Sequence, residues 1–172
     1  MAERLHEFRR SCLVEDRWAP VLDAWLGQRY RLRAATTGEQ WLGIDRMVIA
    51  DDGMVGIDYK CDERAQQTGN AFIELVSNDV SGRWGWGLTS EADWILYFVV
   101  PGQVLAFLAA HLRDALPGWL AQFPVCRAHN GRYRTLGICV PLDEARRVAE
   151  YVAHLDRGDG PVLMPRCEEL AG

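Results

Sequence analysis

Lys60 is the only lysine in this chain of 172 residues, and the other eighteen Lys/Arg positions are all arginine. It lies in the stretch "VGIDYKCDE" (55–63), two residues after Asp58. A lysine ammonium is a compact, strongly hydrated donor whose pKa can shift, so an always-charged guanidinium cannot take its place. Chance survival in an arginine-biased composition is the alternative explanation. The neighbours of Lys60 decide between the two.

Strand alternation places Asp58 and Lys60 on the same face, with Tyr59 pointing to the other. Two polar groups on the face of an apolar strand are costly to bury without a reason. The structural interpretation is an exposed ion pair, worth about 0–1 kcal/mol. The apolar surroundings of "GIDYK" favour a chemical role instead.

A hairpin brings a third polar group to this face. Asp52-Gly53 is a good two-residue turn between the expected strands 41–50 and 54–61. This turn places Asp45 opposite Lys60, and directly opposed residues project from the same face. A register slip of one residue would reverse that placement.

The three residues together predict a metal-dependent hydrolytic site. Hard oxygen ligands suit Mg²⁺, which takes one or two carboxylates and keeps several waters. Asp45 and Asp58 are the expected side-chain ligands of Mg²⁺ or Mn²⁺, and the backbone carbonyl of Tyr59 is a third. Such a metal polarises a phosphate and generates hydroxide from bound water. Lys60 would orient that water or stabilise charge on the phosphate.

The motif "GID…DYK", with thirteen residues from Asp45 to Asp58, resembles the signature of the PD-(D/E)XK nuclease superfamily. "EQWLGID" (39–45) is similar to the segment before the first aspartate in resolvase-like members, and "DYKCDERAQQTGNAFIE" (58–74) is similar to proteins of phages and mobile elements. The resemblance implies a restriction-endonuclease-like core and hydrolysis of DNA, with Asp45, Asp58 and Lys60 as the catalytic residues. RNA as the substrate and a homodimer as the assembly stay open.

Many members of this superfamily carry a further glutamate on the first helix, and no residue here matches it clearly. The candidates for supporting roles are Gln40, Glu74, Asp16 and Asp23, with Glu15 just before the expected helix. Glu74 is equally well explained as a salt-bridge partner. The number of metal ions is therefore open.

Hydrophobic periodicity predicts the elements that must position these residues. The expected helices are 16–27 (with Asp16 as N-cap), one turn in 89–94, 103–116 and 144–155 (capped by Asp143). The expected strands, besides 41–50 and 54–61, are 30–36, 70–77, 94–101 and 133–142, and the segment 82–88 is short and glycine-rich. This order predicts a single α/β domain over 1–172, with a core of about 14–155, a mixed sheet around the hairpin 41–61, flanking helices and a tail at 156–172.

Composition limits the class of protein. No apolar run approaches the roughly 20 residues of a membrane span, and "MAERLHEFRRSC" lacks an apolar signal core. The five cysteines are scattered, without a CxxC pair, which favours reduced thiols in a cytoplasm. The net charge of −5 argues against broad coating of nucleic acid but allows a local site.

Two further segments bear on nucleic-acid binding. The segment "CRAHNGRYR" (126–134) carries Arg127, Arg132 and Arg134. It is read either as a phosphate-contacting loop or as a merely solvated one. The two tryptophans of "RWGWG", Trp84 and Trp86, are expected to pack into the core, with stacking on bases as the alternative.

Two rival functions remain beside the nuclease. One is a non-catalytic nucleic-acid-binding or assembly module on the same fold, in which the carboxylates are structural. The other is an interaction protein of a different α/β fold, in which Asp58 and Lys60 form an ordinary salt bridge.

Overall fold

A computed structural model describes residues 2–51 and 53–162, and for residues 2–13 it describes the backbone only. The main sheet has six strands in the spatial order β1-β2-β3-β6-β7-β10. Their bounds are β1 Arg31–Ala34, β2 Arg46–Ala50, β3 Gly53–Asp62, β6 Trp94–Val99, β7 Gln103–Leu108 and β10 Tyr151–His154. β3 and β6 are parallel and the other neighbours are antiparallel, so the sheet is mixed.

A second sheet is antiparallel and has the order β5-β4-β9-β8. Its strands are β4 Asn70–Asn78, β5 Arg83–Trp84, β8 Val125–Asn130 and β9 Tyr133–Pro141. We expected 70–77 to join the sheet of the hairpin, and that expectation is wrong. The short helix α3 (Ala65–Thr68) ends at Gly69, whose left-handed backbone (φ 70°) lets the chain leave the first sheet.

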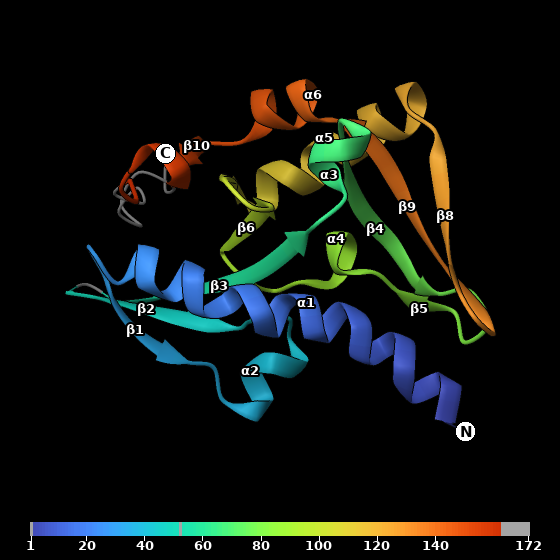
Figure 1. Ribbon diagram of the computed structural model, residues 1–172, viewed down its shortest axis with the longest axis horizontal. Helices are drawn as coiled ribbons and strands as arrows, with labels where there is room; N and C mark the ends of the chain where they lie inside the picture. The colour runs from blue at the N-terminus through green and yellow to red at the C-terminus, as the bar shows by residue number, and fades with distance from the viewer. Residues whose placement is uncertain (1, 52, 163–172) are drawn as a thin grey trace.

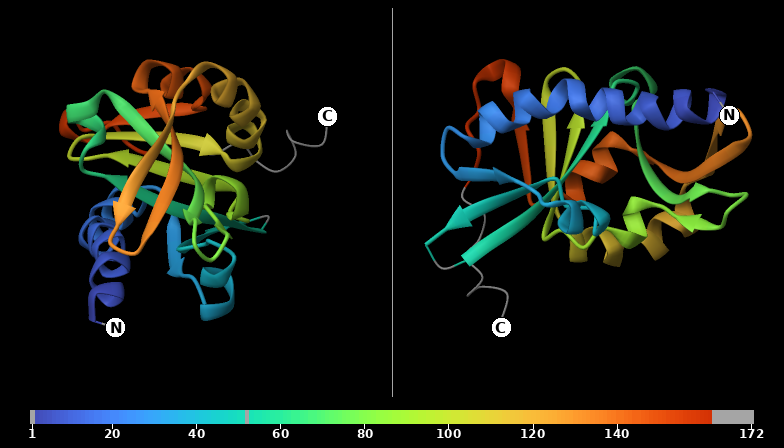
Figure 2. Two further views of the ribbon diagram at one scale, coloured as in Figure 1. Left: turned by 90° about the vertical axis from the view of Figure 1, so that its right-hand side faces the viewer. Right: turned by 90° about the horizontal axis from the view of Figure 1, so that it is seen from below.

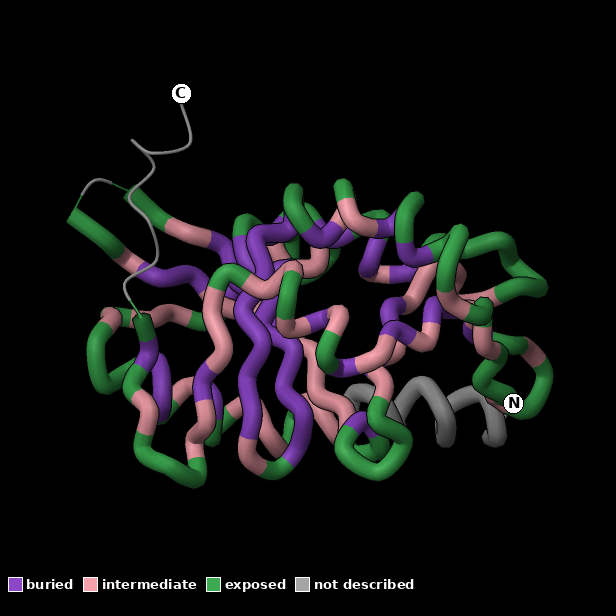
Figure 3. Tube along the Cα trace, turned by 90° about the horizontal axis from the view of Figure 1, so that it is seen from above, coloured by how far each residue is buried: buried purple, intermediate pink, exposed green. Residues whose placement is uncertain are grey.

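Helices cover the main sheet, so the α/β class is confirmed. On one face α1 (Ala2–Leu26) packs through Leu22, Trp25 and Leu26. The second sheet, α5 (Ala109–Gln122) and α6 (Leu142–Val148) share the core on the opposite face (Figures 1 and 2). The buried backbone is concentrated in β6 and β7, which are buried along their whole length (Figure 3).

The first helix is longer than the sequence predicted. α1 begins at Ala2, so Asp16 is an exposed residue inside it rather than its N-cap, and Pro20 also lies inside the helix. The charged segment before Asp16 has no regular apolar stripe, so hydrophobic periodicity did not predict a helix there.

The segment 103–116 was expected to be helical throughout, and this is wrong for its first half. Residues 103–108 form β7, which pairs with β6 after the Val100-Pro101 turn. A short apolar run rich in Leu and Ala has helical propensity, but a tertiary partner overrides propensity. The expected helix 144–155 is likewise divided into α6, β10 and the 3₁₀ turn Leu155–Arg157.

The hairpin exists, but its turn lies one residue earlier than predicted. Gly53 pairs with Ala50, and Arg46 pairs with Ile57. Asp52 lies outside the described residues. Extending this register by one residue sets Asp45 beside Asp58 rather than Lys60, and the parity is unchanged. The first part of the expected strand 41–50 is instead helix α2 (Thr37–Trp41), followed by a short loop.

The cysteine prediction fails for one pair. Cys126 and Cys139 form a disulfide between β8 and β9, whereas Cys61 is free. The expected tail divides as well: the carbonyl oxygens of Pro161 and Val162 accept hydrogen bonds from Arg29 and Tyr30. Its remainder, 163–172, lies outside the described residues. No described helix has the length and apolarity to cross a membrane.

Candidate functional site

The face of β3 that looks toward the second sheet carries Asp58 and Lys60. Asp58 is 1% exposed, and its Oδ1 accepts a hydrogen bond from Lys60 Nζ at 2.5 Å. The other carboxylate oxygen, Oδ2, is buried and accepts no hydrogen bond of normal geometry within the described residues, although the Ser90 side chain lies near enough to lower the pKa of Asp58. A buried polar atom without a partner costs free energy, so this oxygen is available for a ligand.

Burial and neighbouring charge shift both pKa values. Burial raises the pKa of Asp58 to about 7; the Lys60 ammonium opposes this rise and Asp45 adds to it. Burial alone would lower the pKa of Lys60, but the carboxylates of Asp58, Glu15 and Asp45 raise it overall. Lys60 is therefore charged at neutral pH, and Asp58 is only partly ionised there unless further positive charge arrives.

Asp45 lies directly before the first residue of β2. Its Oδ2 accepts a hydrogen bond from the backbone N–H of Tyr59 at 2.7 Å and so takes the place of a backbone carbonyl of β2. The backbone N–H and C=O of one strand residue point to the same side. The Tyr59 carbonyl therefore also faces the Asp45 side, as a third oxygen beside the two carboxylates.

Glu15 belongs to the site, although no residue of the first helix was identified clearly from the sequence. Its carboxylate lies 3.7 Å from Lys60 Nζ. Burial raises the pKa of Glu15, and Lys60 lowers it, while Asp45 and Glu74 raise it. Glu15 lies three residues before Trp18 and seven before Leu22, on the helical face that packs on β3. If the predicted helix had begun before Asp16, the helical spacing of Glu15, Trp18 and Leu22 would have placed Glu15 on the face that packs on β3.

Glu74 reaches the same site from β4, in the second sheet. Burial raises its pKa, and Lys60, the Trp86 backbone N–H and Arg83 lower it. Helix α4 (Trp86–Thr89) packs tightly here, because a Cβ at Gly85 would lie 2.6 Å from the Glu74 carbonyl oxygen. Gly85 and Gly87 are thus needed for close approach to Glu74. The expected helical turn at 89–94 lies earlier in the chain than predicted.

Of the other candidates for supporting roles, only Gln40 lines the groove. Gln40, in α2, is exposed and lines the same groove as Asp45. Asp16 is exposed and does not line it. Asp23 lies on the opposite side of β3, where it pairs with both Arg46 Nε and Nη2 at 2.8 Å and accepts a hydrogen bond from Tyr59 Oη at 2.9 Å.

The cluster lies in a groove of about 1420 Å³ between the two sheets. Around Lys60 it is lined by Glu15, Asp45, Asp58 and Glu74, whereas Asp62, which also lines the groove, already accepts a hydrogen bond from the Tyr97 hydroxyl. The groove continues along β5 and β8, where Arg83, Trp84 and Arg127 line it. Figures 1 and 2 show α1 running past the main sheet toward the tip of the β8–β9 hairpin.

The segment "CRAHNGRYR" forms a hairpin rather than a loop, with its turn at Gly131 (φ 62°) and Arg132. The structure separates its three arginines. Arg127 lines the groove, Arg132 is exposed in the turn, and Arg134 pairs with Asp79 at 3.3 Å.

The two tryptophans of "RWGWG" also divide. Trp86 is half-buried against Tyr97, with Lys60 Nζ 5.8 Å from its ring centre, as a core interpretation requires. Trp84 is 60% exposed, so the core interpretation is wrong for it.

The oxygen atoms of the site are suited to a divalent cation that keeps part of its water shell. Within the described residues, no three His, Cys, Asp or Glu side chains are arranged to hold a metal ion together. Mg²⁺ needs only one or two carboxylates, because water completes its shell. The unpartnered Oδ2 of Asp58, the adjacent Asp45 and four carboxylates around one ammonium fit such a cation.

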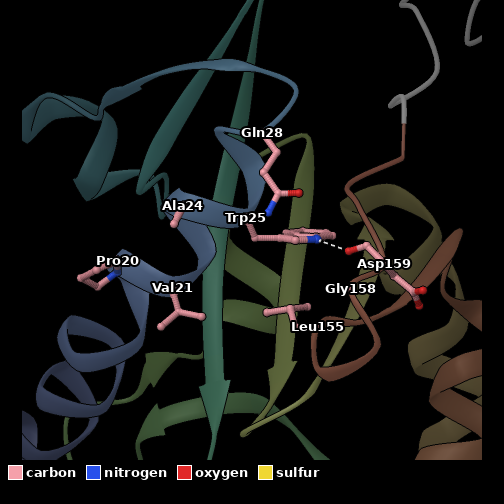
Figure 4. A pocket seen from close by; sticks show the side chains of 8 residues that line it. All are labelled: Pro20, Val21, Ala24, Trp25, Gln28, Leu155, Gly158 and Asp159. Carbon is pink, nitrogen blue, oxygen red and sulfur yellow. Dashed lines mark hydrogen bonds between the residues drawn. The ribbon is translucent and has the colours of Figure 1, made fainter.

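A second, smaller pocket offers a contrast. It measures about 440 Å³ and lies between α1 and the 155–159 segment, lined mainly by apolar atoms (Figure 4). Two of its polar residues already have partners: Trp25 Nε1 donates to the Asp159 carbonyl at 2.8 Å, and Asp159 Oδ2 accepts from the His154 N–H. It holds no cluster of ionisable groups.

Comparisons of the chain with protein-family models, with curated proteins and with solved structures give no significant match.

Proposed function

We propose that this protein is a metal-dependent nuclease that hydrolyses phosphodiester bonds of DNA in the groove between its two sheets. The observation that carries the proposal is the buried Asp58, which pairs with the chain's only lysine through one oxygen and leaves the other without a partner. This pair lies with three more carboxylates at the bottom of a groove large enough for a polymer.

The order of elements supports the same proposal. Asp45 stands at the start of β2, Asp58 and Lys60 lie in β3, Glu15 comes from α1, and β6 runs parallel to β3. This is the arrangement that the resemblance to the PD-(D/E)XK superfamily implies, with Glu15 in the place of the first-helix glutamate. We therefore propose a restriction-endonuclease-like core for the main sheet and α1.

Each residue has a defined task in this proposal. Asp45, Asp58 and the Tyr59 carbonyl would hold Mg²⁺ or Mn²⁺, which when bound polarises the phosphate and makes water acidic. Lys60 donates hydrogen bonds to the phosphate oxygens or to the attacking water, where negative charge grows. Glu15 helps to keep Lys60 protonated, because its carboxylate lies 3.7 Å from the ammonium. Glu74 lies near enough for Lys60 to lower its pKa.

The test is cleavage of supercoiled plasmid and of circular single-stranded DNA by wild type and Lys60→Ala. Each protein is assayed in Mg²⁺, Mn²⁺ or EDTA, after circular dichroism has shown that the variant is folded. We expect cleavage by wild type that requires the metal and is absent in Lys60→Ala. Equal cleavage by both proteins, or cleavage in EDTA, would refute the proposal.

A non-catalytic nucleic-acid-binding module is the second candidate, and one observation favours it. Asp45 already has a structural task at the Tyr59 N–H, and Asp58 already pairs with Lys60. Thermal melts with and without Mn²⁺ separate the two functions, since a divalent site raises the melting temperature by mass action. No change at millimolar Mn²⁺ would favour the binding module.

A further inference from the structure

Two exposed tryptophans line the groove on different elements. Trp41, at the end of α2, is 86% exposed, and Trp84, on β5, is 60% exposed. Large aromatic side chains in solvent are uncommon in a protein that can bury them, and they mark binding surfaces. The other five tryptophans are buried or half-buried.

Both rings lie on hydrogen-bonded elements. The helix that carries Trp41 has a capping box between Thr36 and Glu39, and Arg33 pairs with Glu39 at 2.7 Å. Trp84 lies in β5, opposite Val76 of β4. A ring held by a fixed backbone loses little entropy when a planar group stacks on it.

The charges of the groove are divided along its length. The carboxylates gather around Lys60, whereas Arg83 and Arg127 are exposed in the arm that runs along the second sheet. In the part of the chain that the structure describes, neither guanidinium has a carboxylate within 4.0 Å. Such arginines are suited to phosphates, and the combination of arginines with aromatic rings is typical of single-strand binding.

We propose that this groove holds a single-stranded segment of DNA, with bases stacked on Trp41 and Trp84 and phosphates on Arg83 and Arg127. The inference rests on the proposed function and names its substrate class. In a duplex the base faces are covered by neighbouring bases, so the two rings can contact base faces only where the strand is unpaired. The scissile phosphate would then lie over Asp58 and Lys60.

The experiment measures binding without cleavage. A fluorescein-labelled thymidine 20-mer and a duplex of equal length are titrated in EDTA, and anisotropy gives the dissociation constants. We expect wild type to bind the single strand at least tenfold more tightly than the duplex. Stacking is worth about 1–3 kcal/mol per base, so Trp84→Ala and Trp41→Ala should each weaken single-strand binding by roughly 5- to 150-fold.

Matched variants show whether the rings act by stacking. Trp84→Phe should retain most of the affinity, because it keeps an aromatic face. Leu120→Ala and Met54→Ala remove exposed apolar side chains outside the groove and should bind like wild type. Arg127→Gln should reduce the salt dependence of binding, while Arg147→Gln, on α6, should not.

The inference fails if duplex and single strand bind equally, or if both tryptophan variants bind like wild type. Its failure differs from failure of the nuclease proposal. Cleavage of duplex plasmid by a protein without single-strand preference would support the nuclease proposal and refute single-strand binding in the groove. Tight, tryptophan-dependent binding without any metal-dependent cleavage would support single-strand binding and refute the nuclease proposal.

Discussion

The two faces of β3 carry two polar clusters that are built in opposite ways. On the α1 face, one carboxylate, Asp23, accepts two hydrogen bonds from Arg46 and one from the Tyr59 hydroxyl. On the groove face, four carboxylates surround Lys60, and the Asp58 Oδ2 atom has no partner among the described residues. Two adjacent residues of β3 thus belong to different clusters. Asp58 lies in the groove cluster, which has an unpartnered acceptor, and Tyr59 lies in the Asp23 cluster, whose hydrogen bonds are satisfied.

The difference separates stability from function. A satisfied, charge-neutral cluster needs no further partner, and removing one of its members destabilises the fold because the other charge is left uncompensated. A cluster with excess negative charge and an orphan acceptor is unfavourable by itself, and unfavourable features concentrate at functional sites. Charge balance, rather than the mere presence of an aspartate near a basic residue, is therefore the property that marks the groove face as the site.

The largest expected effect is on catalysis by Asp45→Asn. This change removes a metal ligand but keeps an acceptor for the Tyr59 N–H, so the fold should persist. We expect metal-dependent cleavage to fall by at least about 10³-fold. Asp93→Asn is the matched control, because Asp93 accepts the Gly56 N–H at 2.7 Å but lies outside the groove. A comparable loss in Asp93→Asn would point to strand distortion instead.

Lys60→Arg should lose about 10²-fold in cleavage rate, because the guanidinium keeps the charge but not the compact donor geometry. The measurement is the single-turnover rate at saturating Mn²⁺. Binding of DNA in EDTA serves as the control and should change by less than threefold. A fully active Lys60→Arg would show that any cation suffices and would leave the lone lysine unexplained.

Asp23→Asn should destabilise the protein by about 1–3 kcal/mol, since it breaks a half-buried ion pair and leaves the Arg46 charge without compensation. Urea unfolding measures the change. Metal-dependent cleavage at temperatures where the variant is folded should stay within a few-fold of wild type. A selective loss of activity in the folded variant would show that Asp23 contributes to the functional site.

Asp58→Asn should change stability in the opposite direction to Asp23→Asn. The pKa of Asp58 is about 7 in the fold against an ordinary 3.8, so the folded state binds the proton more tightly. The protonated form stabilises the fold below about pH 4, and this contribution is lost as the pH rises through about 7. An amide resembles the neutral acid and keeps an acceptor for Lys60. In EDTA the variant should therefore melt higher than wild type at pH 8, with the gap closing toward pH 4.

Much of the groove face could be predicted from local sequence because strand parity is a local property. Alternation alone put Asp58 and Lys60 together, and the hairpin was recognisable even though its turn was misplaced by one residue. Parity survived because the shift changed the register by two positions. The assignment of Asp58 to a metal stays a prediction.

The remaining parts depend on tertiary contacts that no local pattern shows. Residues 103–108 read as helix because Leu and Ala favour it, yet β6 supplies an antiparallel partner. Glu74 reaches the site from a second sheet whose existence the sequence did not predict. The exposure of Trp84 depends on where β5 ends relative to β4, which is again a property of the folded molecule.

The contrast between the two faces is tested most directly by titrating metal-free protein with Mn²⁺ and following free Mn²⁺ by electron paramagnetic resonance. Wild type, Asp58→Asn and Asp23→Asn are compared at the same protein concentration. We predict saturable Mn²⁺ binding by wild type and Asp23→Asn, weakened at least tenfold in Asp58→Asn. Unchanged binding by Asp58→Asn, or no binding by folded wild type, would contradict the assignment of the groove face as a cation site.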